Sequence, residues 1–408
     1  MTTNNTRLFK KSLLAVTITL ASSQAMAAGF QLNAQSATGI GRAFAGDAVI
    51  ADNASVMARN PAAMALFDKT ELSLGFESIT SMIEVKDAQY FGQPVADTDD
   101  VGDTSIAPNI HLIVPVNDKF AWGVNAYTNF GTKTEFEDDY AAEVYGGLTD
   151  VMSINFGLAG SYRLNDQWSF GVGLDLIYGE GTMKRSAPNS QGSVYLLDVD
   201  KATGWAVGFN LGTVYELDEN NRFGLAYHYS PEFTAEDDKG QEITLPLPDI
   251  FEFSGYHKIE DTKFAVHYSV QWIGWGDFDQ IEFRNLDQAT SPIGGASGSY
   301  DKAYQWQDGW HYAIGGTYYL NTDWTLRAGY MYDTSAQDEL TSISVPDSDR
   351  QWFSAGFTYH ISEKSNVDLG LTYLLGDDVN VEENSAGPLT ATTHADAILF
   401  GLQYSRSF

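Results

Sequence analysis

Large apolar residues alternate with small or polar residues in three long stretches of the chain, at 168–178, 205–215 and 398–408. A period of two places successive side chains on opposite faces of a β-strand. Here one face is bulky and apolar, and the other carries glycine and polar groups. That pattern is typical of a strand between lipid and a polar lumen. The bulky positions are Trp168, Phe170, Val172, Leu174, Leu176, Tyr178, Trp205, Val207, Phe209, Leu211, Tyr215, Ile398, Phe400, Leu402, Tyr404 and Phe408.

Short turn signals and long polar segments divide the chain into hairpins. Each long segment joins two strands, so seven of them predict a 14-stranded antiparallel transmembrane β-barrel, with both chain ends on the side of the six short turns. In such barrels the short turns are periplasmic and the long loops face outward. The short turns lie at 117–118, 165–166, 218–221, 258–261, 321–323 and 362–364, and the long segments near 81–104, 131–149, 184–202, 231–247, 281–305, 333–349 and 376–392.

Aromatic residues cluster beside the short turns, which is typical of the interfacial girdle of a membrane barrel. The alternative is that they are ordinary core aromatics near strand ends. The positions are Phe120, Trp122, Tyr162, Trp168, Phe223, Tyr319 and Trp324.

The N-terminus carries an export signal. Three basic residues precede an apolar stretch at 13–22, and an Ala-Met-Ala cleavage pattern ends at Ala27. This arrangement is typical of a secretory signal peptide and is too short to span a membrane as a helix. We therefore expect residues 1–27 to be removed and the mature chain to begin at Ala28. No later apolar run reaches the roughly 18 residues of a transmembrane helix.

Composition narrows the function classes. The chain of 408 residues has a net charge of −31, which argues against nucleic acid as a partner because phosphate binding needs a basic surface. It has no cysteine, so it forms no disulfide and has no thiolate chemistry. Aromatic residues make up 13% of the chain, whereas disordered chains are poor in them.

Residues 28–69 lack sustained alternation and precede the first strand, which we expect to begin near Thr70, with the barrel at 70–408. This segment is too apolar for a solvated tail. Irregular backbone at membrane depth is tolerated only when it is buried in protein or lines a cavity. We therefore expect a plug inside the barrel. Pro61 is expected to end a short helix there, and Asn60 to hydrogen-bond locally.

The chain resembles the outer-membrane long-chain fatty acid and hydrocarbon transporters of Gram-negative bacteria (FadL/TodX-like). The resemblance covers residues 28–408. The motifs that carry it are the start Ala28-Gly29-Phe30-Gln31-Leu32, the plug or hatch segments Gly39–Ala43 and Ala51–Ala54, the hatch motif Asn60-Pro61-Ala62, and the stretches 110–132, 162–174 and 344–359.

The resemblance implies a mechanism. The hatch blocks a direct aqueous path, and a hydrophobic ligand passes from an outer groove to a lumen pocket near the hatch N-terminus. Hatch movement then opens a route to a gap in the wall, made by an inward kink of the third strand. The family pattern puts Phe30 against the ligand pocket. It puts the kink at Asn129-Phe130-Gly131, where glycine tolerates a bend.

The resemblance also implies basic residues that meet a ligand carboxylate. Arg185 lies near one such position, and a lumen cation suits a carboxylate. The alternative is a loop-base arginine in a surface salt bridge, worth about 0–1 kcal/mol. The second position carries Gln307 here, with His311 nearby. This departure favours neutral hydrocarbons or a different anchor, so fatty acid is the leading ligand class.

Other function classes remain open. A general diffusion porin is the alternative to a selective transporter, but it needs no plug and no kink. We expect no enzyme activity, no catalytic residues, no cofactor and no metal site, and we expect a monomer in contact with outer-membrane lipid and lipopolysaccharide. The acidic outer loops are expected to be solvated, although they could also bind Ca²⁺ or bridge to lipopolysaccharide.

Overall fold

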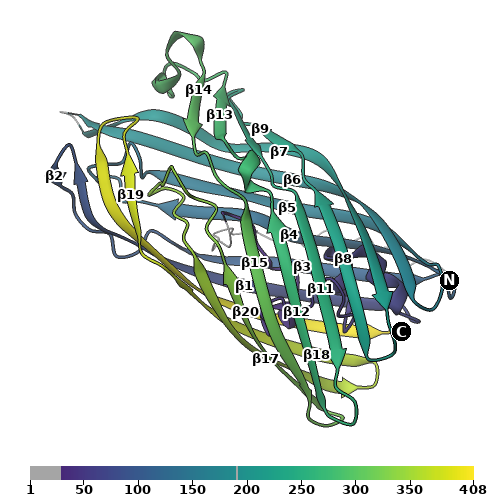
Figure 1. Ribbon diagram of the computed structural model, residues 1–408. Coiled ribbons are helices and arrows are strands. Elements are labelled where there is room, and N and C mark those ends of the chain that lie inside the picture. The colour runs from purple at the N-terminus through teal and green to yellow at the C-terminus, as the bar shows by residue number, and fades with distance from the viewer. Residues whose placement is uncertain (1–28, 190–191) are drawn as a thin grey trace, which may run out of the picture.

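The computed structural model describes residues 29–189 and 192–408, so the predicted signal peptide and Ala28 lie outside the described residues. The described chain forms a closed antiparallel barrel of 14 strands, as predicted, in which the first strand, β1, pairs with the last, β20. Figure 1 shows the strands tilted around a long barrel. The barrel strands are β1 (Glu71–Tyr90), β3 (Thr104–Pro115), β4 (Phe120–Glu135), β5 (Leu148–Arg163), β6 (Trp168–Asn189), β7 (Gly192–Glu216), β8 (Asn221–Tyr229), β11 (Ile250–Lys258), β12 (Phe264–Ile273), β15 (Gly309–Tyr319), β16 (Trp324–Asp333), β17 (Arg350–Ser362), β18 (Ser365–Gly376) and β20 (Leu389–Ser407).

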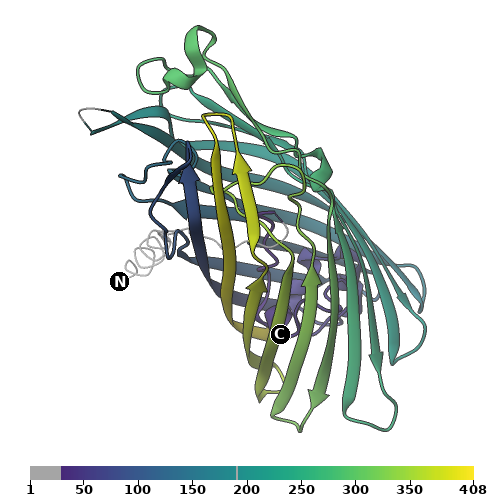
Figure 2. The ribbon, with the colours of Figure 1, turned by 60° about the vertical axis from the view of Figure 1, so that its left-hand side comes forward.

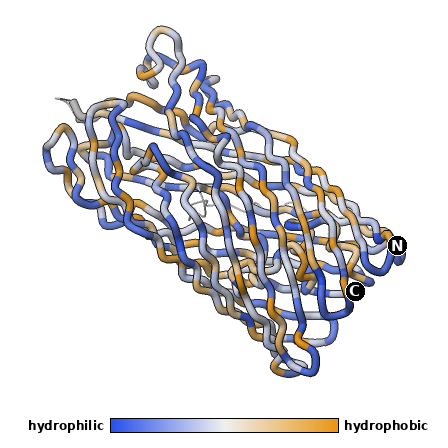
Figure 3. The backbone as a smooth tube through the Cα atoms, viewed as in Figure 1, coloured by the Kyte–Doolittle hydropathy of each residue, from blue (hydrophilic) through white to orange (hydrophobic). Residues whose placement is uncertain are grey.

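The outer face of the barrel is apolar, as the alternation predicted. Leu174 on β6 and Val207 on β7 are 59% and 64% exposed, whereas Ser169 and Asp175 on the opposite face of β6 are buried. In Figure 3, hydrophobic and hydrophilic positions alternate along the strands. Among the described residues, no helix is long and apolar enough to cross a bilayer.

All six short turns lie where the sequence predicted them. In the turn from β3 to β4, the Asn117 side-chain oxygen accepts hydrogen bonds from the backbone N–H groups of Lys119 and Phe120. Asn165 and Asn321 close the β5–β6 and β15–β16 turns in the same way. The recurring Asx geometry explains why asparagine marks these turns.

The seven long connections are also present, but several of their predicted bounds are wrong. β1 continues to Tyr90, β4 to Glu135, and β6 and β7 form a ladder through most of the segment predicted as loop at 184–202. Polar residues mark where a strand leaves the lipid. They do not mark where it ends, because ladder hydrogen bonds persist in water.

The long connections contain short elements of their own. Figure 1 shows β13 and β14, in the β12–β15 connection, rising beyond the neighbouring strands. These elements are β2 (Gln93–Pro94), β9 (Glu232–Glu236), β10 (Glu242–Pro246), η3 (Trp275–Asp277), β13 (Gln280–Arg284), η4 (Pro292–Ser297), β14 (Tyr300–Ala303) and β19 (Val379–Glu383).

The N-terminal segment lies inside the barrel, toward the end with the short turns and the C-terminus (Figures 1 and 2). It contains α1 (Ala37–Ile40), η1 (Ala54–Ala58) and η2 (Pro61–Leu66), and its residues from 29 to 50 are all buried. Pro61 begins η2, so the prediction that it ends a helix is wrong. Its fixed φ suits a first helical position, where its missing N–H is no loss. The Asn60 side chain caps η2 by accepting from the Ala62 N–H, so the expected local bond is present.

Inward-facing glycines of the barrel make room for this segment. A Cβ at Gly212 on β7 would lie 1.9 Å from the Asn60 side-chain oxygen, and one at Gly171 on β6 would lie 2.3 Å from the Ala62 nitrogen. The glycine face that the sequence indicated as lumen lining is therefore, at these positions, the seat of the N-terminal segment.

Candidate functional site

The lower lumen, at the short-turn end, is filled by polar contacts between the N-terminal segment and the wall. Arg42 lies 2.7 Å from Asp47 and 3.0 Å from Asp52, and Arg327 of β16 lies 3.1 Å from the same Asp52. Arg42 and Asp47 are almost fully buried. A buried charge is tolerated when it is paired in this way.

The hatch motif Asn60-Pro61-Ala62 is held by directional hydrogen bonds in the same region. The Asn60 side-chain amide donates to the carbonyl of Ala48 at 2.7 Å and to that of Thr213 on β7 at 3.1 Å. Together with the cap to Ala62, these bonds use both ends of the amide. An asparagine side chain carries both a donor and an acceptor on a short stem. Asn60 can therefore bond to the backbone of the N-terminal segment and to the barrel wall at the same time.

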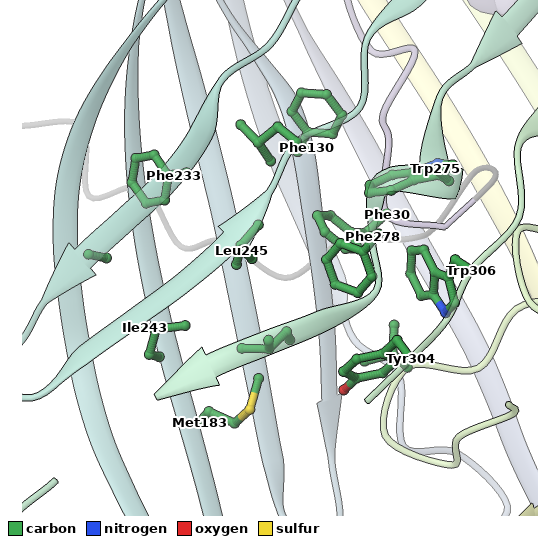
Figure 4. Close-up of a cluster of buried hydrophobic side chains, with 14 of the residues drawn as sticks. Phe30, Phe130, Met183, Phe233, Ile243, Leu245, Trp275, Phe278, Tyr304 and Trp306 are labelled. Carbon is green, nitrogen blue, oxygen red and sulfur yellow. The ribbon is translucent and has the colours of Figure 1, made fainter. Parts of the chain in front are cut away.

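Phe30 lies farther up, inside a cage of aromatic rings (Figure 4). Its ring centroid is 4.6 Å from that of Trp275, 5.5 Å from that of Phe278 and 5.7 Å from that of Trp306. These partners come from the β12–β15 connection. Gly29 turns the chain into the cage with a φ of +68°, and a Cβ there would lie 2.6 Å from Trp306, so glycine is required.

β4, the third strand of the barrel, is irregular at the predicted kink. Its register against β5 shifts between Thr128 and Phe130, and its pairing with β3 stops at Ala126. Beyond that point β4 pairs with the N-terminal segment instead. The Leu32 N–H donates to the carbonyl of Asn129, and the Gly131 N–H donates to that of Phe30. The β3–β4 ladder is therefore interrupted after Ala126, and farther out the Glu135 N–H of β4 donates to the carbonyl of Val101, just before β3.

A cavity of about 280 Å³ lies above the Phe30 cage, among the outer connections. Most of its lining is aliphatic or aromatic, and two cations, Arg185 and Lys302, are part of it. Its lining residues are Val144, Tyr145, Met183, Arg185, Leu196, Leu197, Phe283, Ile293, Tyr300, Lys302, Ser385 and Ala386.

Arg185 on β6 is 4% exposed, which does not fit a surface salt bridge. Its guanidinium donates to the carbonyls of Leu148 and Lys184 and to the Thr149 hydroxyl, each at 2.7 Å. Within the described part of the chain, it has no carboxylate partner. These contacts fix the guanidinium at the cavity wall and leave its charge uncompensated by an ion pair.

The other predicted ligand contacts lie away from this cavity lining. Gln307 is exposed and its amide donates to the carbonyl of Ser335 at 3.3 Å. His311 on β15 is buried, with Nδ1 3.3 Å from the Asn33 amide and Nε2 3.6 Å from Asp333. Neither residue joins Arg185.

Lys302 is the cation that sequence reasoning missed. A signal was present: Tyr300 and Lys302 share one face of β14, and Tyr304, just past the end of that strand, continues the period of two. In the structure the Lys302 ammonium lies 5.3 Å from the centre of the Tyr304 ring and 3.0 Å from Glu383. Long-loop residues cannot be assigned to a site until the loop's own pairing is known.

Side chains pack tightly in the part of the lumen beside the kink. A cavity of only about 20 Å³ remains among Gln31, Arg59, Tyr127 and their neighbours, which is room for about one water molecule. Among the described residues, no group of three or more His, Asp or Glu side chains is placed to hold a metal ion.

Comparisons with known proteins agree with this architecture. The family model for outer membrane protein transport protein (OMPP1/FadL/TodX) matches residues 18–408. The chain is 34% identical over 450 aligned positions to the long-chain fatty acid transport protein of Escherichia coli O6:H1, covering 98% of this chain and 99% of that protein. It is also 34% identical to outer membrane protein P1 of Haemophilus influenzae, with the same coverage of each.

Solved structures share the fold. A Pseudomonas aeruginosa FadL homologue superposes with a TM-score of 0.80 at 20% identity, covering 93% of this chain and 100% of that one. The Pseudomonas putida toluene transporter TodX gives a TM-score of 0.66 at 16% identity, covering 87% and 94%. The predicted family resemblance and outer-membrane location are thus confirmed, and the chain belongs to the outer membrane protein transport protein family (OMPP1/FadL/TodX).

Proposed function

We propose that this protein takes up long-chain fatty acids or other hydrophobic compounds across the outer membrane. The observation that carries the proposal is one continuous cluster of buried apolar side chains between the Arg185 cavity and the β4 kink. Met183, Leu197 and Phe283 belong both to this cluster and to the cavity lining, and Phe130 of the kink belongs to its other end. An apolar path of this kind lowers the cost of moving an acyl chain past a polar layer.

Arg185 anchors the ligand carboxylate in this proposal. Its buried guanidinium has no carboxylate partner among the described residues, and charge-assisted hydrogen bonds to carboxylates are the strong ones. The head group would rest at Arg185 and the acyl chain would extend toward the Phe30 cage. A cavity of about 280 Å³ is at the small end for ligand pockets, so a long chain must displace rings of the cage.

Residues 28–69 act as a hatch in this mechanism, and Asn129-Phe130-Gly131 form a lateral gate. The same Phe30 packs in the cage and accepts a hydrogen bond from Gly131. A ligand that displaces Phe30 therefore also loosens the N-terminal segment from β4. The interruption of the β3–β4 ladder after Ala126 is the exit that we propose, and release into lipid needs no energy source.

The N-terminal segment, buried inside the barrel, argues against a diffusion porin, which needs an open aqueous path. Neutral hydrocarbon uptake remains the alternative, since most of the cavity lining is uncharged. We further propose that the protein works as a monomer among outer-membrane lipids and lipopolysaccharide, since its strands already pair around a closed ring. We also propose that it has no catalytic role.

Ligand binding tests the proposal directly. Purified protein in detergent is titrated with oleate, an alkane of similar length and an aromatic hydrocarbon, for the wild type and Arg185→Ala. We expect the substitution to weaken oleate by about tenfold or more, the worth of a charge-assisted hydrogen bond, and to leave the neutral ligands unchanged. Equal binding of all three ligands by both proteins would favour the neutral hydrocarbon alternative. Steady large conductance in a planar bilayer would favour a porin.

A further inference from the structure

Lys302, the second cation of the cavity, already has an internal carboxylate. Its ammonium lies 3.0 Å from Glu383 at the end of β19, and the side chains are 13% and 7% exposed. Burial lowers the pKa of Lys302, but Glu383 and Tyr304 together outweigh burial and leave the pKa above its ordinary value. Lys302 therefore keeps its charge at neutral pH, and the carboxylate 3.0 Å away offsets that charge beside the cavity.

Glu383 is held in place by a second contact. Its other carboxylate oxygen accepts a hydrogen bond of 3.0 Å from the backbone N–H of Ile343, in the β16–β17 connection. Lys302 also lies 3.4 Å from the Ser342 hydroxyl in the same connection. Fixed acceptors on two connections thus occupy two of the three donors of the ammonium.

We propose that Glu383 is a specificity-determining residue that offsets Lys302 and so lowers the preference of the cavity for carboxylate over uncharged head groups. The inference rests on the proposed function and names the ligand selectivity of the same cavity. With Glu383 in place, only Arg185 attracts the head group. The cavity therefore accepts a neutral hydrocarbon chain at little cost, while still binding a fatty acid through one cation.

The charges around the cavity support this balance. Lys302 lines the cavity, but Glu383 is not part of the lining and approaches Lys302 from the outer connections. A ligand carboxylate placed between Arg185 and Lys302 would meet one cation without a direct ion pair among the described residues and one cation paired with Glu383, whose charge also acts on Arg185 from farther away. In a partly buried site, charges a few ångströms apart interact strongly. Removing the negative charge of Glu383 should therefore strengthen the attraction between the cavity and a ligand carboxylate considerably.

Two variants test the proposal. Glu383→Gln keeps the shape and removes the charge, which frees Lys302. The double variant Glu383→Gln with Lys302→Met removes the pair and restores a single cation. Each is titrated with oleate and with oleyl alcohol, which has the same chain and no charge, using full-length mature protein in detergent. Unchanged heat-modifiable mobility on gels checks that each barrel is folded.

We expect Glu383→Gln to bind oleate about tenfold more tightly, roughly one charge-assisted contact, and to bind oleyl alcohol within about twofold of the wild type. The double variant should bind both probes about as the wild type does. Asp301→Asn is the matched control, because Asp301 is the neighbour of Lys302 on β14 but pairs with exposed Arg284. It removes a charge of the same sign near the mouth and should change neither affinity.

Other results would overturn the inference. Unchanged oleate affinity in Glu383→Gln would show that the offset is absent, and equal tightening in Asp301→Asn would assign the effect to overall surface charge. Loss of oleate binding in the double variant would show that Lys302 is already an anchor. The proposed function fails separately: a wild type that binds neither probe overturns both, whereas a wild type that binds both probes leaves only the role of Glu383 in question.

Discussion

The two halves of the lumen are filled by different kinds of contact. Near the periplasmic turns, buried ion pairs and amide hydrogen bonds fasten the N-terminal segment to the wall. Farther out, Phe30 is held mainly by ring packing, beside a cavity of about 280 Å³. Hydrogen bonds and ion pairs are directional and costly to break singly, whereas apolar contacts are non-directional. The difference suggests a fixed seal below and a region above whose side chains can exchange with a ligand.

The largest expected effect comes from breaking the lower network. Arg42→Met leaves Asp47 and Asp52 without their shared cation, and Asp47 is almost fully buried. Removing one partner of a buried pair costs about 3–5 kcal/mol, and we expect the lower end of that range because Asp47 keeps Arg59 at 3.8 Å and Asp52 keeps Arg327 at 3.1 Å. We expect lower stability against urea and a new steady conductance in planar bilayers.

Arg284→Met is the control for this change. Arg284 also pairs with two carboxylates, Glu282 and Asp301, but all three are substantially exposed. An exposed pair contributes about 0–1 kcal/mol, so this variant should keep its stability and stay closed. If both variants leak equally, the lower network is not the seal.

The next effect tests the glycine seat of the hatch motif. Gly212→Ala puts a Cβ 1.9 Å from the Asn60 side-chain oxygen, so one of the two groups must move. Overpacking of this kind costs about 1–3 kcal/mol. We expect partial displacement of the segment, read as increased protease cleavage near Asn60. Gly160→Ala on β5 is the matched change, because the nearest atom to its Cβ is 4.0 Å away, and it should have no such effect.

The barrel was predictable from the sequence because lipid on one side and a filled lumen on the other impose a strict period of two. The turns were predictable because Asn117 and its counterparts carry their own hydrogen-bond acceptors. The N-terminal segment was predictable as a non-strand segment, but its contacts were not. Gly212 appears in the sequence only as a small inward residue, and its partner Asn60 lies 152 positions earlier.

The outer site was the least predictable part. Lys302 reaches the cavity through β13 and β14, a hairpin that is paired outside the regular barrel order. The spacing that would reveal it covers four residues, which is too short to distinguish a strand from a loop. Arg185 was identified by resemblance alone, and its burial depends on carbonyls of β5, far away in the sequence.

A smaller effect is expected in the upper half. Phe30→Ala removes a ring from a cage that contains Trp275, Phe278 and Trp306. The vacated volume is apolar, and apolar cavities stay dry and bind small hydrocarbons. We expect benzene to bind the variant at least about tenfold more tightly than the wild type, because burying a few carbons is worth more than 1.4 kcal/mol.

The matched change for Phe30 is Phe44→Ala, which also removes a buried phenyl ring from the N-terminal segment, next to Trp352 in the lower cluster. This variant should lose stability without enlarging the outer cavity. Equal gains in benzene affinity in both variants would show that any cavity in the lumen binds the probe. The Phe30 cage would then be no better suited to a hydrophobic ligand than the lower cluster.

The smallest expected effect concerns the two backbone hydrogen bonds between β4 and the N-terminal segment. Gly131→Pro removes the N–H that donates to Phe30, and this N–H faces the N-terminal segment. One such bond is worth about 0.5–1.5 kcal/mol. We expect faster hydrogen exchange at the Leu32 amide, which donates to the neighbouring carbonyl of Asn129. Asn129→Ala keeps that carbonyl and removes a side-chain oxygen that has no hydrogen-bond partner among residues 29–189 and 192–408, so exchange at Leu32 should stay at the wild-type rate. Because the two variants are two residues apart in the same irregular strand, equal acceleration in both would mean that the strand itself loosens. Acceleration in Gly131→Pro alone would mean that the backbone bond to Phe30 is what couples the aromatic cage to the wall.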